Sequence, residues 1–207
     1  MLDYFYFAFL MLVGQLSPGP DMLLILKNSF NYNLRAALFT IFGIIAGIIV
    51  HTTIALTGLT FLFRKGNTIY LILKYGGAVY LSYLGIRLLL SLKGSRTPEP
   101  GEETRAQEAI SDAGAFAQGL LTNLLNPKVV IIISSILLMF LGEDSSLAQR
   151  LIYGAILVIE GLVVWVLFAL LLQTRQARNQ FLRWQNPINA IFGLLLILLA
   201  IRAVVTL

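Results

Sequence analysis

The apolar run from Tyr4 to about Leu26 is interrupted in its middle by the sequence Ser-Pro-Gly-Pro at positions 17–20. Without the interruption, the run would be long enough to cross a bilayer as one helix. Each proline removes an amide donor and clashes with the carbonyl four residues earlier, so one unbroken helix cannot form. We therefore predict two half-helices, Tyr4 to Leu16 and Pro20 to about Phe30, with Ser17 as the N-cap of the second.

Such a break has two interpretations. Non-helical backbone at membrane depth is tolerated only where it is buried in protein or lines a cavity. The second half-helix would begin near mid-membrane with free amides and a partial positive charge, which suits an anion such as a carboxylate. The alternative is a proline kink that binds nothing, and this segment alone does not separate the two.

The composition is that of a polytopic membrane protein. Of 207 residues, 58% are hydrophobic and 12% are charged, whereas a soluble domain is about half apolar and a quarter charged. The absence of cysteine excludes disulfides and thiolate metal sites. The net charge of +5 comes from basic residues at the ends of apolar runs, so we expect a lipid bilayer and no nucleic acid as partner. The N-terminus lacks the basic region of a signal peptide, so we expect the first segment to be retained.

The fold class predicted is an all-α membrane protein with six transmembrane helices. The spans are about 4–30 (broken), 36–63, 67–92, 116–141, 151–172 and 187–206. The segment 93–114 is polar and without apolar period, and is typical of a solvated linker. We expect a single transporter domain, 1–207, made of a first half 1–92, a cytoplasmic linker 93–115 and a second half 116–207.

The basic residues predict the orientation. Eight lie in or beside the connections between spans 1–2, 3–4 and 5–6, and four lie on the opposite side. The positive-inside rule then places both termini outside, in a bacterial-type inner membrane.

Two halves of three spans, if related, have opposite topology and form an inverted repeat. The fourth span is also broken, at Asn126-Pro127, where Pro127 would open a half-helix capped by Asn126. Aligning Pro20 with Pro127 puts Asp21 opposite Lys128. A further sequence similarity relates Leu84-Gly85-Ile86-Arg87 in span three to Leu199-Ala200-Ile201-Arg202 in span six.

Both breaks are expected at the same depth. Each proline lies ten or eleven residues from the inner end of its span, which is roughly 15 Å and near the bilayer midplane. Two positive helix ends would therefore converge on one point, the arrangement by which interrupted helices mark a transporter binding site.

Two ionisable residues lie near the middle of apolar spans. Glu160 in span five is costly there if charged and unpaired, and it serves either as a structural, neutral acid or as a counter-ion for a substrate ammonium and a proton site. His51, the only histidine, either hydrogen-bonds a neighbouring helix or carries the coupling proton, alone or as a relay between Glu160 and the outside. Asp21 and Lys128 either bind substrate or pair with each other.

The candidate binding residues are those at and near the two breaks and Glu160. They are Gln15, Ser17, Pro18, Gly19, Pro20, Asp21, Asn123, Asn126, Pro127, Lys128 and Glu160.

Small residues predict close helix packing. They are Gly43, Gly47, Gly77 and Gly85.

Taken together, these motifs resemble the LysE/RhtB family of amino-acid exporters. The carriers of the resemblance are Ser-Pro-Gly-Pro in span one, the glycines and His51 of span two, residues 77–85 of span three, Asn126-Pro127-Lys128, Glu160, and Asn189 to Gly193 in span six. The match covers nearly the whole chain. It implies efflux of amino acids or close derivatives, coupled to protons by antiport, without an enzymatic reaction, cofactor or metal, and compatible with a homo-oligomer.

The sequence departs from the family pattern at three points. Asp21 stands where asparagine is more usual, Glu160 where aspartate is more usual, and span four lacks a Pro-Gln-Phe near its end. The acid at position 21 leaves open whether the substrate is cationic.

Two other functions remain as rivals. A divalent-cation exporter of the wider superfamily would need more oxygen ligands than the spans hold. An intramembrane enzyme would need a serine beside His51, but no Gly-x-Ser-x-Gly motif is present.

Overall fold

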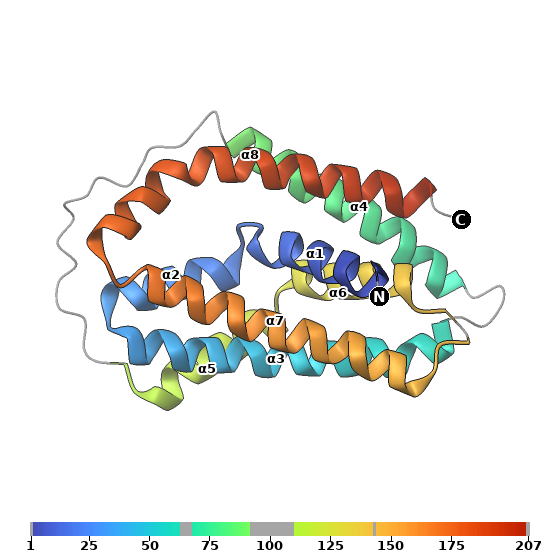
Figure 1. Ribbon diagram of the computed structural model, residues 1–207, viewed down its shortest axis with the longest axis horizontal. Coiled ribbons are helices and arrows are strands. Elements are labelled where there is room, and N and C mark those ends of the chain that lie inside the picture. The colour runs from blue at the N-terminus through green and yellow to red at the C-terminus, as the bar shows by residue number, and fades with distance from the viewer. Residues whose placement is uncertain (1, 63–67, 92–109, 143, 206–207) are drawn as a thin grey trace.

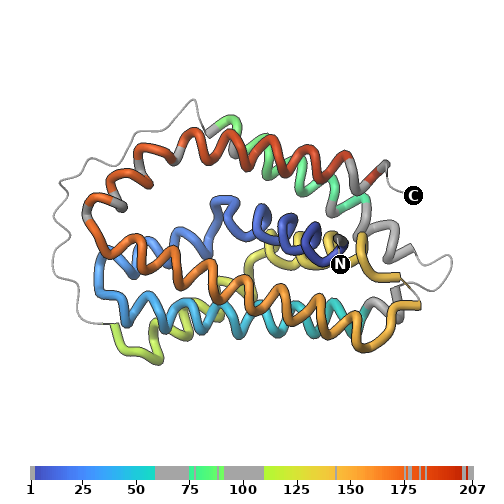
Figure 2. The backbone as a smooth tube through the Cα atoms, viewed as in Figure 1, coloured from blue at the N-terminus to red at the C-terminus, as the bar shows by residue number. Residues whose placement is uncertain are grey.

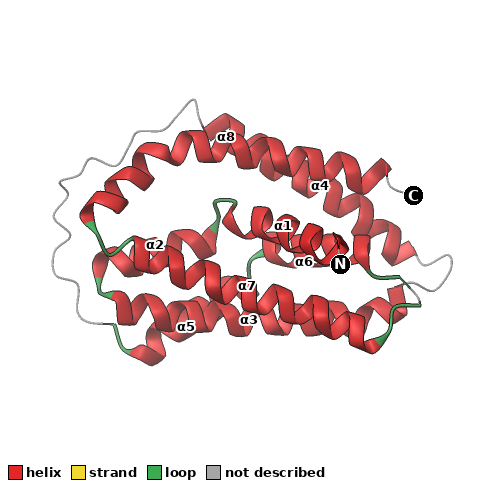
Figure 3. Ribbon diagram, viewed as in Figure 1, coloured by secondary structure: helices red, strands yellow, loops and turns green. Residues whose placement is uncertain are grey.

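The computed structural model describes residues 2–62, 68–91, 110–142 and 144–205, and every regular element among them is a helix. The helices are α1 (Leu2–Leu16), α2 (Pro20–Asn31), α3 (Leu34–Leu62), α4 (Thr68–Ser91), α5 (Asp112–Leu124), α6 (Pro127–Phe140), α7 (Leu147–Leu171) and α8 (Arg175–Val205). The prediction of an all-α fold is confirmed (Figure 3).

The first break bends the chain by 61° between α1 and α2. The prediction that Ser17 caps α2 is wrong. The Ser17 amide still donates to the Val13 carbonyl at 3.1 Å, so Ser17 belongs to the end of α1, and its hydroxyl donates to the Gly14 carbonyl at 2.9 Å. Gly19 is the N-cap instead, with an extended backbone and no side chain to cap with, and Pro20 opens the helix. Two residues are needed to turn the chain, which displaces the cap from Ser17.

The second break bends the chain by 58° between α5 and α6 and follows the prediction more closely. Pro127 opens α6, and the Asn126 side chain caps it by accepting a hydrogen bond from the Lys128 amide at 3.1 Å. An asparagine cap before a proline at the first helical position is the arrangement that the sequence predicted.

Two helix boundaries differ from the prediction. Helix α8 begins at Arg175 and runs through Pro187, so the helix that carries the predicted span six begins twelve residues before that span. A proline within a helix removes one hydrogen bond and kinks the helix without ending it, and the first part of α8 bends away from the rest (Figure 2). Helix α5 begins at Asp112, capped by Ser111, so the last residues of the predicted linker are helical. The rest of the predicted linker, up to residue 109, lies outside the described residues.

Two layers of helices enclose α1 and α6, one half of each broken pair (Figure 1). Helices α4 and α8 form one layer, and α3, α5 and α7 form the other, with α1 and α6 between them. The buried core draws on both layers and on the broken helices, through residues such as Phe7, Ile44, Leu81, Leu157 and Leu196. Both termini lie at the same end of the bundle, as does the turn between α6 and α7 (Figure 1).

Glycines set the closest helix crossings. A Cβ at Gly43 of α3 would overlap the Phe116 carbonyl oxygen of α5, and one at Gly47 would overlap the Asn123 side chain. A Cβ at Gly85 of α4 would lie 2.6 Å from the Gly193 carbonyl oxygen of α8. Small residues thus let these backbones touch, as predicted. The surroundings of Gly77 lie outside the described part of the structure.

Length and hydropathy identify fewer spans than the sequence predicted. Within the described residues, Leu34–Gly58 of α3 and Leu147–Leu171 of α7 are long and apolar enough to cross a membrane. Each of the two bent pairs also passes when its halves are taken together, which gives up to four spans. The apolar stretch of α8, Asn186–Ile201, is shorter. The structure is that of an α-helical membrane protein, and the six-span count stays a prediction.

Candidate functional site

The two helix breaks meet at the middle of the long axis of the molecule (Figure 3). Lys128 of α6 reaches into the first break, where its ammonium donates a hydrogen bond to the Ser17 carbonyl. Asp21 of α2 reaches toward the second break, where the Asn123 amide donates to its carboxylate at 2.7 Å and the Asn126 amide at 3.4 Å. The first break is therefore bound by Lys128, from the helix after the second break. The second break is bound by Asp21, from the helix after the first.

Helix dipoles explain these partners. The Ser17 carbonyl ends α1 and carries partial negative charge, which suits the Lys128 ammonium. Asp21 lies in the first turn of α2, where a carboxylate is stabilised by the free amides. Lys128, by contrast, lies in the first turn of α6, where a cation is unfavourable and an anionic partner is needed.

The charged side chains at the breaks are buried. Asp21 and Lys128 are each 7% exposed, and Asn123 is fully buried. Gly19 makes room for the lysine, because a Cβ there would lie 2.9 Å from Lys128 Nζ. Among the described residues, Asp21 and Lys128 form no ion pair with each other. The lysine therefore has a neutral carbonyl as partner, and its charge is not cancelled by a direct anionic contact.

A cavity of about 30 Å³ lies beside the two charges. It has room for about two water molecules and not for an amino acid. Helices α1 and α6 pack tightly beside it, since a Cβ at Gly14 would lie 2.7 Å from Ile132 Cγ2. The lining residues are Met11, Gly14, Gln15, Asp21, Met22, Ile48, Lys128, Val129, Ile132, Ile133, Leu157 and Trp165.

Gln15 lines this cavity from the last turn of α1, as predicted. Both polar atoms of its side chain, Oε1 and Nε2, are buried and have no hydrogen-bond partner. A Cβ at Gly161 of α7 would lie only 3.4 Å from Gln15 Oε1, so α7 covers the amide without offering it a polar group.

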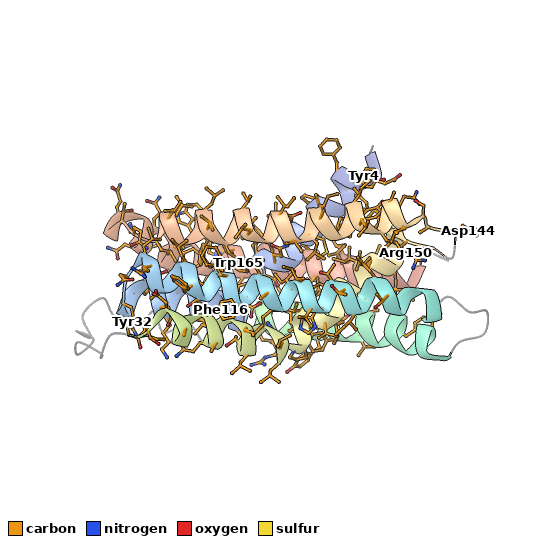
Figure 4. All side chains as sticks on the ribbon, turned by 90° about the horizontal axis from the view of Figure 1, so that it is seen from below. Tyr4, Tyr32, Phe116, Asp144, Arg150 and Trp165 are labelled. Carbon is orange, nitrogen blue, oxygen red and sulfur yellow. The ribbon has the colours of Figure 1, made fainter. Side chains whose placement is uncertain are left out.

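Glu160 lies beside the cavity and not in its lining. Its neighbours on α7, Leu157 and Trp165, line the cavity, and Trp165 lies in the interior between α7 and α3 (Figure 4). Both carboxylate oxygens of Glu160 are buried without a hydrogen-bond partner. A buried carboxylate without a partner needs a proton or a cation. Glu160 therefore lacks a partner that Asp21 already has in Asn123 and Asn126.

His51 contacts the second break and has no hydrogen bond to Glu160 within the described structure. Its Nε2 lies 3.2 Å from the Asn123 carbonyl oxygen, at the C-terminal end of α5. The Asn123 side chain in turn donates to Asp21. The structure thus links His51 to the Asp21 side of the site, which spacing along α3 could not indicate.

A second polar cluster was not predicted. Asn28 of α2 donates to Thr40 Oγ1 of α3 at 2.7 Å and to Gln118 Oε1 of α5 at 3.3 Å, and both Asn28 and Thr40 are fully buried. Beyond it, Arg35 and Asp112 form a bidentate ion pair between the starts of α3 and α5. The available signal was the presence of polar residues on apolar helices, which does not show that they meet.

No metal site is evident in the part of the chain that the structure describes, since no group of three or more His, Cys, Asp or Glu side chains is close enough to hold an ion. The divalent-cation reading therefore gains no support from this site.

Comparison with known proteins identifies the family. The model of the LysE type translocator family matches residues 12–206. The chain belongs to this family. The resemblance to LysE/RhtB transporters is thereby confirmed, and the family, with its apolar helices, indicates an integral inner-membrane protein.

Several curated relatives of this LysE-family chain cover four-fifths of its length or more. The threonine efflux protein of Escherichia coli K12 is 29% identical over 189 residues, which is 91% of this chain and 90% of the relative. The homoserine/homoserine lactone efflux protein of Salmonella typhimurium LT2 is 28% identical over 196 residues, 93% and 92% of the two chains. An uncharacterized membrane protein of Bacillus subtilis 168, YrhP, is 31% identical over 173 residues, 81% and 80%. No solved structure matches the chain.

Proposed function

We propose that this LysE-family protein exports neutral amino acids from the cytoplasm by exchange with protons. The relatives named above are efflux proteins for threonine and for homoserine and its lactone, and the likeness extends over nine-tenths of the chain. The observation that carries the proposal is the meeting of two helix starts and a buried lysine at one small cavity.

The substrate carboxylate binds at Lys128. In this conformation, the Lys128 ammonium donates to the Ser17 carbonyl. A carbonyl is a weaker partner than a carboxylate because it carries only partial charge. The starts of α2 and α6 add two further positive ends. An incoming carboxylate replaces the Ser17 carbonyl, which releases the contact between the two breaks and lets α1 and α6 separate.

The substrate ammonium binds at Glu160, and a proton replaces it on return. Both Asp21 oxygens already accept hydrogen bonds from Asn123 and Asn126, whereas both Glu160 oxygens have no partner. A carboxylate that is buried without a partner is neutralised by either a proton or an ammonium, and binding of one excludes the other. This alternation is the basis of antiport. His51, bonded to Asn123, connects the Asp21 side of the site to α3 and is the second candidate for the coupling proton.

The membrane arrangement that we propose has six spans, an inverted repeat and both termini outside. Gly85 and Gly193 support the repeat, because each glycine's missing Cβ faces the carbonyl oxygen of the other. Gly193 lies 108 residues after Gly85, and Pro127 lies 107 residues after Pro20. Two independent features therefore point to nearly the same offset between the halves. The similarity between Leu84–Arg87 and Leu199–Arg202 needs an offset of 115, about two helical turns more, and is not supported by this packing.

Filling the breaks tests the proposal. We expect replacement of Pro18-Gly19-Pro20 by alanines to abolish uptake of labelled threonine into everted vesicles, because a continuous helix removes the start of α2 and places a Cβ against Lys128 Nζ. Replacement of Asn126-Pro127 by alanines should do the same at the start of α6. Alanine at Leu23, an exposed position on α2, is the control for expression and insertion. Wild-type transport by either inserted break variant would refute the proposed role of the breaks.

A further inference from the structure

The Gln15 side chain is a polar group that the proposed transport of a bare amino-acid backbone does not use. Its Oε1 and Nε2 atoms are buried without a hydrogen-bond partner, although the residue lines the central cavity. Leaving a buried amide unpaired is costly, so an unpaired amide in a cavity points to a ligand that completes its hydrogen bonds.

The cavity offers Gln15 no polar partner of its own beyond the two charged residues. Asp21 accepts from two asparagines and Lys128 donates to Ser17, so both are occupied. Apart from the indole N–H of Trp165, the other lining side chains carry no strong hydrogen-bonding group, and Gly14 has no side chain. On the side of α7, the residue that faces Gln15 Oε1 is Gly161, which has no side chain to offer a polar group.

We propose that Gln15 is a specificity-determining residue that recognises a hydroxyl group on the substrate side chain, so that the preferred substrates are neutral hydroxy amino acids. This inference rests on the proposed function, in which Lys128 binds the α-carboxylate and Glu160 the α-ammonium. Because Lys128 and Glu160 bind the two charged groups of the amino-acid backbone, the Gln15 amide is left to face the substrate side chain.

The chemistry of an amide fits a hydroxyl. The Gln15 Nε2 donates and its Oε1 accepts, and a hydroxyl can accept the first and donate to the second. An aliphatic side chain of the same size would leave both amide atoms buried and unpaired. A site built to bind a hydroxyl rejects the analogue that lacks it far better than an apolar pocket rejects one that has it.

The rest of the lining limits what the side chain can be. Met11, Ile48, Leu157 and Trp165 surround the cavity with apolar surface. A second negative charge on the substrate would be buried there without a counter-ion, and a positive one would have to displace Asn123 and Asn126 from Asp21 to gain one. We therefore expect cationic and acidic amino acids to be poor substrates, in spite of the acid at position 21.

Threonine and valine provide the matched pair of substrates, because they differ only by a hydroxyl in place of a methyl group. We expect wild-type protein in everted vesicles to take up threonine with a KM lower than that for valine by on the order of tenfold or more. Gln15→Met keeps the length of the side chain and removes its amide. In this variant the threonine preference should fall to about threefold or less, because the unpaired-amide penalty against valine disappears.

The matched control is Gln176→Met, at an exposed position on α8 away from the cavity, which should keep the wild-type ratio. An equal loss for both substrates in Gln15→Met would overturn the inference, because Gln15 would then bind the amino-acid backbone. A changed pH profile with an unchanged ratio would overturn it too, because Gln15 would then act on Glu160.

A wild-type measurement keeps the inference testable if Gln15→Met does not insert. O-methylthreonine keeps the acceptor of the hydroxyl and loses its donor, so its KM should exceed that of threonine by several-fold or more. Equal KM values for threonine, O-methylthreonine and valine would overturn the assignment while leaving amino-acid export intact. Absence of uptake for all three would instead refute the proposed function on which it rests.

Discussion

Asp21 and Lys128 occupy the same position in the two broken helices, one residue after the opening proline, and each binds the break to which the other belongs. The two charges are opposite in sign and 107 residues apart in sequence, yet neither binds the other in the described structure. Each interacts instead with neutral carbonyl or amide groups. This arrangement holds the breaks together and leaves Lys128 without a carboxylate partner, as the proposed binding of a substrate carboxylate requires.

The glycine crossings predict which substitutions the helix packing tolerates. Gly43→Ala places a methyl group against the Phe116 carbonyl and Leu120 amide of α5, so the two helices must separate. We expect a loss of about 1–3 kcal/mol of stability, measured as a lower midpoint of thermal unfolding in detergent. Gly58→Ala on the same helix meets nothing within 4 Å and should be neutral or slightly stabilising. Equal midpoints for the two variants would show that α3 and α5 do not cross at Gly43.

The proposed orientation predicts where introduced cysteines react. The chain has no cysteine, so a single substitution gives a clean signal. A cysteine at Ser95, in the predicted linker, should react with a membrane-impermeant maleimide only in everted vesicles. A cysteine at Asp144, in the turn that shares an end with the termini, should react only in intact cells (Figure 1). The reverse pattern would invert the topology.

Two substitutions distinguish Glu160 from His51 as the residue that carries the coupling proton. Glu160→Gln fixes the neutral form of the side chain, so it should abolish efflux driven by a pH gradient while leaving slow, pH-independent exchange. His51→Asn keeps a hydrogen-bond donor for the Asn123 carbonyl and should reduce the rate less. The measurement is threonine uptake into everted vesicles over a range of imposed gradients. Full pH dependence in Glu160→Gln, with loss in His51→Asn, would assign the proton to the histidine.

The breaks were predictable because proline acts locally. A missing amide and a fixed φ interrupt a helix wherever they occur, so the starts at Pro20 and Pro127 and the cap at Asn126 followed from the sequence. The cap at Ser17 did not, because the number of residues that the turn consumes depends on the 61° bend. The start of α8 was missed for a related reason, since Pro187 kinks a helix that has polar residues on both sides of it.

The partners within the site were not predictable. Lys128 binds Ser17 and His51 binds Asn123 across 111 and 72 residues, and such contacts depend on how the broken helices cross. Hydropathy predicted a mid-membrane position for Glu160, but the choice between facing the cavity and lying beside it depends on the rotation of α7. The buried Asn28–Thr40 pair was missed because single polar residues on apolar helices do not reveal their partner.

The central claim is that Lys128 binds the substrate carboxylate, and the KM of threonine uptake in Lys128→Met tests it most directly. The variant keeps the length of the side chain and removes the charge, and Lys27→Met, at an exposed position on α2, is the control. We predict that the KM rises on the order of ten- to a hundredfold in Lys128→Met, as expected for loss of a charged hydrogen bond, and does not change in Lys27→Met. A wild-type KM in correctly inserted Lys128→Met protein would contradict the account.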